Sequence, residues 1–288
     1  MTGNIVWIAS YPKSGNTWFR AFITNLIAGS GSPAPINRLL AENGIARSLF
    51  DAATGIDSAH LFPEEVDSLR PGMYNKISAS SHGPRFLKIH AAYQYLPDGH
   101  PIFPTKATRC TIYLARNPLD AACSYARFLN LGLDRVIAKM NEDGHVFNRE
   151  TSDMSNALSQ RIFNWSENVL SWLGAPADMK VHLIRYEDML RNPAAAFGQA
   201  VRAIGLDKSE EEILRAISFS SFDTLKEMED KESFKEKPPQ ADAFFHAGKS
   251  GGWRNILSHA QASAIVEKHQ TVMRRLGYLD ADGNVLDL

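Results

Sequence analysis

Apolar positions change their spacing within the first 29 residues, from a strand-like run to a helical stripe. Residues 4–10 (NIVWIAS) are rich in β-branched and aromatic side chains, which predicts a buried strand. Adjacent apolar pairs then recur four residues apart, as in an amphipathic helix, and Gly29 is suited to end it. These pairs are Trp18 and Phe19, Phe22 and Ile23, and Leu26 and Ile27. The segment therefore predicts a strand, a tight turn and a helix.

The rest of the chain alternates strand-like and helical patterns. Further strands are expected over 84–90, 110–115 and 180–185. Helical spacing predicts helices over 118–128, 158–173, 209–231 and 258–276, with another started or interrupted by Pro193. No internal repeat or long linker divides this α/β pattern, so we expect a single domain over 1–288.

Three regions are less regular. Residues 36–70 have weak helical patterns, which indicate short helices with mobile connections. Residues 132–156 are polar and punctuated by glycine, so we expect a mobile loop with little regular structure. Residues 237–254 are broken by glycine and proline, and their GKSGGWR string is a second candidate anion-binding loop, although a surface loop explains it equally well.

The turn at 11–17 (YPKSGNT) has the composition of an anion-binding loop. Gly15 lets the backbone approach a ligand, and the amides that follow it are the unsatisfied donors of a helix start. Lys13 adds a mobile positive charge, and Ser14 and Thr17 add hydroxyls. The lysine precedes the glycine, so the turn is not a Walker A loop. We expect it to bind a phosphate or sulfate group.

Candidate polar residues also stand at the ends of the later strands. Lys88 and His90 end the strand at 84–90 and share one of its faces, because residues two apart in a strand point the same way. A lone histidine is more often structural than catalytic, and a parallel strand is needed to bring His90 beside the anion loop. Arg116 ends the next strand, and Ser124 lies two helical turns further on, where a serine is ordinarily solvated or bonded to its own helix.

The overall composition excludes several classes of protein. The chain has 288 residues, 44% of them hydrophobic, which is enough for a substantial core. Its 31 basic and 32 acidic residues nearly cancel, so we expect neither nucleic acid nor an anionic membrane as a partner. Cys110 and Cys123 form no disulfide framework, no apolar run is long enough to span a membrane, and the first residues lack a secretory signal. We therefore expect a cytoplasmic protein.

Five strings in this order give the chain a resemblance to a known family. They are YPKSGNTW, FLKIH, ARNPLDAACSYARF, YEDM and GKSGGWRN, and together they span nearly the whole chain. The chain resembles the sulfotransferases that use 3′-phosphoadenosine 5′-phosphosulfate (PAPS), in their cytosolic, single-domain form. The resemblance implies a three-layer, P-loop-like α/β fold, with a central and mainly parallel sheet flanked by helices.

The resemblance also implies a set of co-substrate-binding residues. The 5′-phosphosulfate would lie in the loop at 11–18, the 3′-phosphate at Arg116 and Ser124, and the adenine against Trp18, Tyr186 and the segment 220–222. In full, the implied set is Lys13, Ser14, Gly15, Asn16, Thr17, Trp18, Arg116, Ser124, Tyr186, Ser220, Phe222, Gly248 and Lys249.

The catalytic residues implied by the resemblance are His90, Lys13 and Lys88. His90 would be the base, since its ordinary pKa is near neutrality, and Lys13 would stabilise charge on the bridging oxygen as it leaves. The products would be a sulfate ester of a small-molecule hydroxyl acceptor and 3′-phosphoadenosine 5′-phosphate (PAP). This scheme needs no metal, and the nine histidines have no ligand spacing.

The chain departs from the family pattern at three places. Asn16 stands where the family usually has threonine, and it keeps a hydrogen-bonding side chain. His246 and Ala247 replace a basic pair before Gly248, so Lys249, Arg254 or another arginine would have to hold the 3′-phosphate. The dimerisation string of the animal enzymes, which would begin near Arg254, is largely absent, so the oligomeric state stays open.

Two other classes of function are alternatives. A kinase or phosphotransferase would need Mg²⁺ ligands, for which Ser14 and the acidic pair Glu187 and Asp188 are candidates. A non-catalytic nucleotide-binding protein is disfavoured by the presence of both Lys13 and His90. The acceptor pocket would come from 36–75 and 128–157 and would suit a phenol, a lipid-like alcohol or a glycosylated natural product. Its apolar contacts would be Phe128, Leu129, Leu131 and Phe147.

Overall fold

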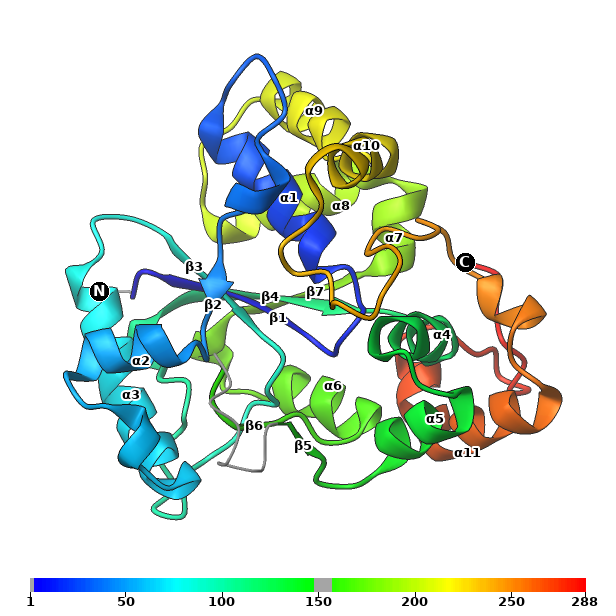
Figure 1. Ribbon diagram of the computed structural model, residues 1–288, viewed down its shortest axis with the longest axis horizontal. Coiled ribbons are helices and arrows are strands. Elements are labelled where there is room, and N and C mark those ends of the chain that lie inside the picture. Colours follow the sequence, from blue (N-terminus) through cyan, green and yellow to red (C-terminus); the bar gives the residue numbers. More distant parts are fainter. Residues whose placement is uncertain (1–2, 148–156) are drawn as a thin grey trace. The chain divides into compact units, whose positions relative to one another are not determined.

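A computed structural model describes residues 3–147 and 157–288, which form two compact units. Figure 1 follows the chain through both units. The first unit takes the described residues of Met1–Tyr11, Ala41–Tyr113 and Asp143–Leu183. The second unit takes Pro12–Leu40, Leu114–Glu142 and Ile184–Leu288.

The first unit contains the strands of the main sheet. Its elements are β1 (Ile5–Ser10), β2 (Glu42–Asn43), α2 (Arg47–Thr54), α3 (Pro63–Ser80), β3 (Arg85–Ile89), β4 (Thr108–Ala115), β5 (Val146–Phe147), β6 (Gln160–Arg161), α6 (Trp165–Leu173) and β7 (Val181–Arg185). Short 3₁₀ turns lie at η2 (Ser58–His60), η3 (Thr105–Ala107) and η4 (Ala177–Met179). The last two residues of β4 and of β7 belong to the second unit.

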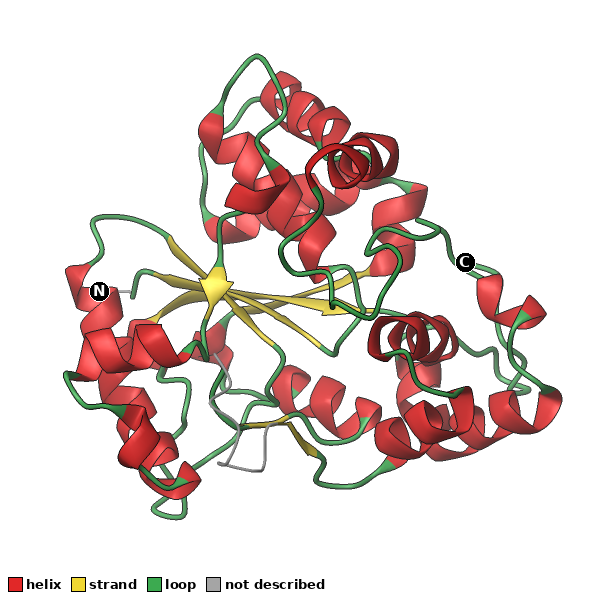
Figure 2. Cartoon of the chain, in the orientation of Figure 1, coloured by secondary structure: helices red, strands yellow, loops and turns green. Residues whose placement is uncertain are grey.

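The main sheet has five strands in the order β2-β3-β1-β4-β7, and β5 pairs with β6 separately. β1 runs parallel to β3, with a register from Ile5 opposite Arg85 to Ala9 opposite Ile89. β2 also pairs with β3 in parallel. All six residues of β1 are buried, as expected for a central parallel strand. Figure 2 shows these strands in yellow among the helices. The sequence prediction of a mainly parallel sheet flanked by helices is confirmed.

The second unit is helical. Its elements are α1 (Asn16–Ala28), η1 (Ile36–Arg38), α4 (Pro118–Leu129), α5 (Leu133–Asn141), α7 (Tyr186–Arg191), α8 (Pro193–Ile204), α9 (Glu210–Phe219), α10 (Phe222–Glu232), η5 (Gly252–Asn255) and α11 (His259–Arg275). α1 ends as predicted, because Gly29 takes a left-handed conformation with φ 59° and its N–H bonds to the carbonyl of Asn25. α8 begins at Pro193, where a missing N–H has no cost.

Two expectations from the sequence are wrong, one for a loop and one for a helix. Residues 132–156 were expected to have little regular structure, but Leu133–Asn141 form α5. Val136, Ile137 and Met140 make one buried face on this helix, a short stripe that the surrounding charged residues obscure in the sequence. Residues 148–156 of this region lie outside the described residues.

The second error concerns the helix expected over 158–173. Residues 160–161 form β6, and α6 begins only at Trp165. Asn164 caps this helix, since its side chain accepts from the amide of Glu167 while the Glu167 side chain accepts from the amide of Asn164. The capping box therefore sets the helix start inside an otherwise continuous apolar pattern. Within residues 3–147 and 157–288, no helix is long and apolar enough to cross a membrane.

Candidate functional site

The turn between β1 and α1 leaves a helix start open toward a ligand. Gly15 is the N-cap of α1 and has φ 94°, a left-handed conformation that suits glycine. Among the described residues no side chain caps this helix start, and its first turn has no acidic residue. The first amides of α1 and the positive end of its dipole therefore favour a negatively charged group, as the sequence predicts.

Ser14 gives the turn a hydroxyl donor that no described residue accepts from. Its side chain is fully buried, and its hydroxyl has no hydrogen-bond partner among the described residues. Burying a hydroxyl without a hydrogen-bond partner costs free energy of folding. A bound ligand that accepts a hydrogen bond from this hydroxyl would remove that cost. An oxygen of a phosphate or sulfate group is such an acceptor.

Gly15 also lies against the start of α7. A Cβ atom at this position would be 2.8 Å from Cδ2 of Tyr186 and 3.0 Å from Cε of Met189. The ring of Trp18 contacts Tyr186 edge-on, with ring centroids 5.7 Å apart. Tyr186 is buried, which raises the pKa of its hydroxyl. The tight turn, Trp18 and Tyr186 therefore form one packed group in the second unit.

Arg116 connects three of the predicted motifs. Its Nη1 donates to the carbonyl oxygen of Lys13 (3.2 Å), and its Nη2 donates to that of Lys249 (3.0 Å). Its guanidinium carbon is 4.2 Å from the ring centroid of Tyr186, and its Nε is buried without a partner among the described residues. Ser124 lies two turns along α4 and is half-buried. The structure thus brings Arg116, Lys13, Tyr186 and Lys249 together.

The ammonium group of Lys13 lies close to two aromatic rings. Its Nζ is 4.0 Å from the ring centroid of Phe128 and 4.4 Å from that of Phe244. Both distances are within the range of cation–π attraction. Lys13 also has a positive φ of 68°, an uncommon conformation for a residue other than glycine. The charge of Lys13 is therefore next to apolar side chains from α4 (Phe128) and from the segment before Gly248 (Phe244).

Phe222 and Gly248 are in contact, whereas Ser220 is used by its own helix. A Cβ atom at Gly248 would be 2.5 Å from Cδ2 of Phe222, so the backbone of Gly248 lies on that ring. The hydroxyl of Ser220 is buried and donates to the carbonyl of Ala216 at the end of α9. Ser220 therefore stabilises the junction between α9 and α10, where Phe222 begins the second helix.

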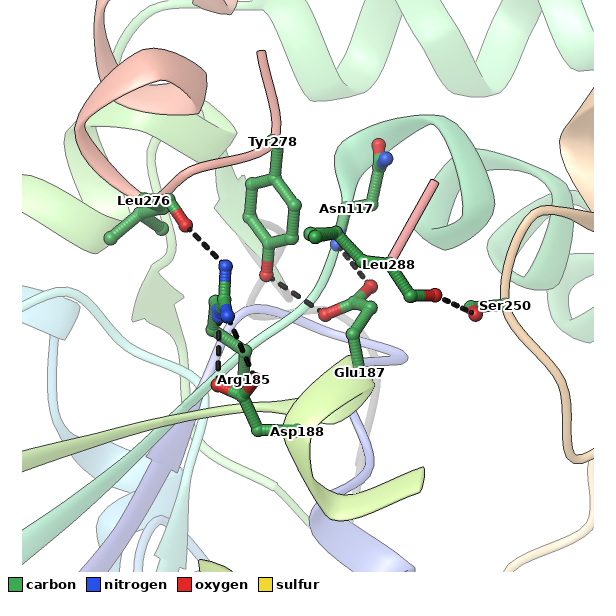
Figure 3. A network of polar contacts seen from close by, with 8 residues as sticks. All are labelled: Asn117, Arg185, Glu187, Asp188, Ser250, Leu276, Tyr278 and Leu288. Carbon is green, nitrogen blue, oxygen red and sulfur yellow. Dashed lines mark hydrogen bonds and ion pairs between the residues drawn. The ribbon is translucent and has the colours of Figure 1, made fainter. Parts of the chain in front are cut away.

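Glu187 is at the centre of a polar network in the second unit (Figure 3). One carboxylate oxygen accepts from the amide of Asn117 (3.0 Å) and the other from the hydroxyl of Tyr278 (3.1 Å). Burial raises the pKa of Glu187, and the Asn117 amide opposes this effect. Asp188 forms a two-point ion pair with Arg185 at 2.7 Å. Both members of the acidic pair that a kinase would need are thus held by internal donors.

His90 lies in the first unit, at the end of β3. Its Nδ1 is 2.8 Å from the carbonyl oxygen of Ser10 and 3.2 Å from the Ser10 hydroxyl. A carbonyl oxygen only accepts, so Nδ1 carries the proton and, in the neutral ring, Nε2 carries the lone pair. The side-chain amide of Asn168 donates to the backbone carbonyl of His90 (2.9 Å). Lys88, two residues earlier, is half-buried opposite Ile8 of β1.

The remaining predicted residues are placed as follows. Asn16 is buried and Thr17 is half-buried in the first turn of α1. His246 and Ala247 are exposed, and Lys249 is exposed beside Arg116. Arg254 pairs with Asp287 at 2.6 Å. Within this segment it is therefore the backbone of Lys249 that contacts Arg116.

Several polar residues of the second unit were missed by sequence reasoning. Asp120 and Glu229 are buried carboxylates that accept from backbone amides of the segment 237–254, and Tyr278 donates to Glu187. The sequence offers only weak signals for them. An aspartate in a first helical turn is ordinarily explained by the helix dipole, as for Asp120. Within the part of the chain that the structure describes, no three His, Cys, Asp or Glu side chains are grouped so that they could hold a metal ion.

The fold and this site define a class of protein: an α/β protein whose strand–turn–helix loop is suited to an anion such as a phosphate group. The chain belongs to the sulfotransferase family, since the family model described as a sulfotransferase domain matches residues 4–277. The resemblance found in the sequence is thereby confirmed, and the chain is a sulfuryl-transferring enzyme.

Individual relatives are distant but cover most of the chain. Flavonol 3-sulfotransferase of Flaveria bidentis is 26% identical over 281 residues, covering 91% of this chain and 79% of that protein. Sulfotransferase 1 family member D1 of Rattus norvegicus is 25% identical over 270 residues, covering 92% and 81%. A solved structure of retinol dehydratase in complex with retinol and PAP matches with a TM-score of 0.60 and 19% identity, covering 95% of this chain and 82% of the other. This last likeness shows the fold.

Proposed function

We propose that this sulfotransferase transfers the sulfuryl group of PAPS to a hydroxyl of a small-molecule acceptor. One observation carries the proposal: the buried Ser14 hydroxyl, without a partner among the described residues, stands at an uncapped helix start. Donors in this arrangement fit the terminal oxygens of a phosphosulfate. The structure of the retinol dehydratase relative in complex with PAP supports the choice of nucleotide.

The residues of the second unit divide between the two ends of PAPS. Lys13, Ser14, Gly15, Asn16 and Thr17 would hold the 5′-phosphosulfate, since they surround the helix start. The remaining residues serve the far end, with Arg116, Ser124, Gly248 and Lys249 at the 3′-phosphate and Trp18, Tyr186 and Phe222 at the adenine. Ser220 would act only by holding Phe222 in place, because its hydroxyl is bonded within α9.

The transfer requires a base and a group that stabilises the leaving oxygen. In the proposed reaction the acceptor oxygen forms a bond to sulfur while the bond from sulfur to the bridging oxygen of PAPS breaks. Nε2 of His90 takes the acceptor proton, because Nδ1 is already protonated toward the Ser10 carbonyl. Lys13 and the helix-start amides stabilise the charge that develops on the departing phosphate. Lys88 would assist from the strand that carries His90.

The acceptor is proposed to be an apolar or aromatic alcohol. The rings of Phe128 and Phe244 stand beside the Lys13 ammonium group, so the reacting end of the site has apolar walls. A flavonol 3-sulfotransferase is among the relatives, and the related retinol dehydratase structure contains retinol. A phenol, a lipid-like alcohol or a glycosylated natural product would meet these conditions.

We further propose that both units act as one sulfotransferase domain in the cytoplasm. The family model spans nearly all of both units. Cys110 and Cys123 are buried as free thiols, which suits a reducing compartment.

The test uses purified protein, radiolabelled PAPS and a panel of alcohols and phenols. The expected result is labelled acceptor without added Mg²⁺, with variant Ser14→Ala binding PAP more weakly than the wild type. Mg²⁺-dependent phosphate transfer from ATP, with no turnover of PAPS, would instead identify a kinase.

A further inference from the structure

Asp120 holds the loop that follows Gly248 through two backbone amides. It lies in the first turn of α4 and is only 5% exposed. One carboxylate oxygen accepts from the amide of Gly251 (2.7 Å) and the other from the amide of Trp253 (3.1 Å). Hydrogen bonds to an ionised acceptor are stronger than neutral ones, so this side chain is a firm attachment point for the loop.

Arg116 holds the same loop at its other end. Its Nη2 donates to the carbonyl oxygen of Lys249, four residues before Trp253. Gly251, whose amide donates to Asp120, has φ 78°, a left-handed conformation that suits glycine. The backbone from Lys249 to Trp253 is therefore hydrogen-bonded to Arg116 at its start and to Asp120 at Gly251 and Trp253.

We propose that Asp120 is a positioning residue for the 3′-phosphate end of PAPS, and this inference rests on the proposed function. The Asp120 carboxylate is an anion, so it does not bind the phosphate itself. It docks the loop on α4, which keeps the exposed Lys249 next to Arg116. With His246 and Ala247 before Gly248, the charge that this loop contributes to 3′-phosphate binding comes from Lys249, so that contribution depends on Asp120.

Variant Asp120→Asn tests the proposal with little change of volume. Its amide nitrogen would face a backbone N–H, donor against donor, so one of the two attachments is lost. Titration calorimetry should show PAP binding weakened by about tenfold, the effect of one lost charge-assisted hydrogen bond. Binding of adenosine 5′-phosphosulfate, which lacks the 3′-phosphate, should stay within about twofold of the wild type.

Glu229 offers a matched control. It is a second buried carboxylate that accepts from two backbone amides of the same segment, those of Phe244 (2.5 Å) and Phe245 (3.0 Å). They belong to the part of the segment that contacts Lys13, because the ring centroid of Phe244 lies 4.4 Å from the Lys13 ammonium nitrogen. Glu229→Gln should therefore weaken the binding of PAP and of adenosine 5′-phosphosulfate equally, so that the ratio of their affinities stays unchanged.

Two more variants make the test decisive. In a Lys249→Ala background, Asp120→Asn should have less than about twofold further effect on PAP, because the residue that it positions is gone. Gly251→Ala strains the loop backbone itself, because alanine is disfavoured at the positive φ of this position. It should reproduce the selective loss of PAP affinity even if Asp120→Asn fails to fold.

The outcomes separate this inference from the proposed function. Three results would each overturn the role of Asp120. In Asp120→Asn, the affinities for PAP and adenosine 5′-phosphosulfate could fall equally, or PAP affinity could stay unchanged. In the double variant, the effects of Asp120→Asn and Lys249→Ala on PAP affinity could be fully additive. A wild-type protein that binds PAP no better than adenosine 5′-phosphosulfate would instead overturn the assignment of the 3′-phosphate to this loop, and with it the proposed nucleotide site.

Discussion

Nδ1 of His90 lies 2.8 Å from the carbonyl oxygen of Ser10, the last residue of the strand that leads into the anion-binding turn. The parallel register of β1 and β3 produces this contact, because Ala9 stands opposite Ile89 and the next residues of the two strands come together. The hydrogen bond selects the tautomer with its lone pair on Nε2, which is the form that a general base requires.

His90→Gln should therefore lose transfer while it keeps the nucleotide. We expect kcat to fall by at least about 100-fold, the usual contribution of a general base, with PAP affinity within about twofold of the wild type. Ser10→Ala is the control, since it removes only the hydroxyl at 3.2 Å and keeps the carbonyl contact. Wild-type kcat in His90→Gln would show that His90 is not the base.

Ser14→Ala should change stability and binding in opposite directions. The variant removes a buried hydroxyl that has no partner among the described residues, so the nucleotide-free protein should unfold at the same or a higher temperature. PAP should bind about tenfold more weakly, because a hydrogen bond to a charged group is lost. Thermal unfolding with and without PAP measures both effects. A variant that is less stable and binds PAP normally would contradict the assignment.

Gly15→Ala should be much more costly than the same change at Gly29. Both glycines have positive φ, 94° and 59°, so each substitution carries the backbone penalty of about 1 kcal/mol. Only Gly15 adds a clash, because its Cβ would lie 2.8 Å from Tyr186, whereas a Cβ at Gly29 meets nothing within 4 Å. We expect about 2 kcal/mol or more of lost stability for Gly15→Ala in urea unfolding. Equal losses at the two positions would show that Tyr186 does not restrict the turn.

Glu187→Gln should make the protein relatively more stable as pH rises. The folded state raises the pKa of Glu187 through burial, so it binds more protons than the unfolded state between the ordinary and the raised pKa. The wild type therefore loses stability as pH rises through that window, while a neutral glutamine does not titrate. The glutamine oxygen can accept from the Asn117 amide, and its NH₂ can donate to a rotated Tyr278 hydroxyl.

Urea unfolding of both proteins between about pH 4 and pH 7 checks this prediction. The difference in unfolding free energy should move in favour of Glu187→Gln across the range. A constant difference would mean that Glu187 has the same pKa in the folded and unfolded states.

Local patterns were read correctly over the first 29 residues. β1 and α1 follow from an unbroken apolar run and from pairs four residues apart, and Gly29 ends the helix. The helix at 133–141 was missed because its apolar face has only three buried residues, and the helix expected from 158 begins later because Asn164 caps it. Short or capped segments depend on contacts that periodicity does not contain.

The candidate site shows the same division. The sequence by itself determined a strand, a glycine turn with Lys13 and Ser14, and the helix that follows, because these depend on residues close together in the chain. Only the tertiary structure brings Asp120 to the amide of Gly251, 131 residues away. It also places the carbonyl of Ser10 where it orients the ring of His90, 80 residues away. A carboxylate in a first helical turn has the same local appearance whether it serves its own helix or a distant loop. Burial and the position of the two accepted amides distinguish these roles, and both arise only when the chain is folded.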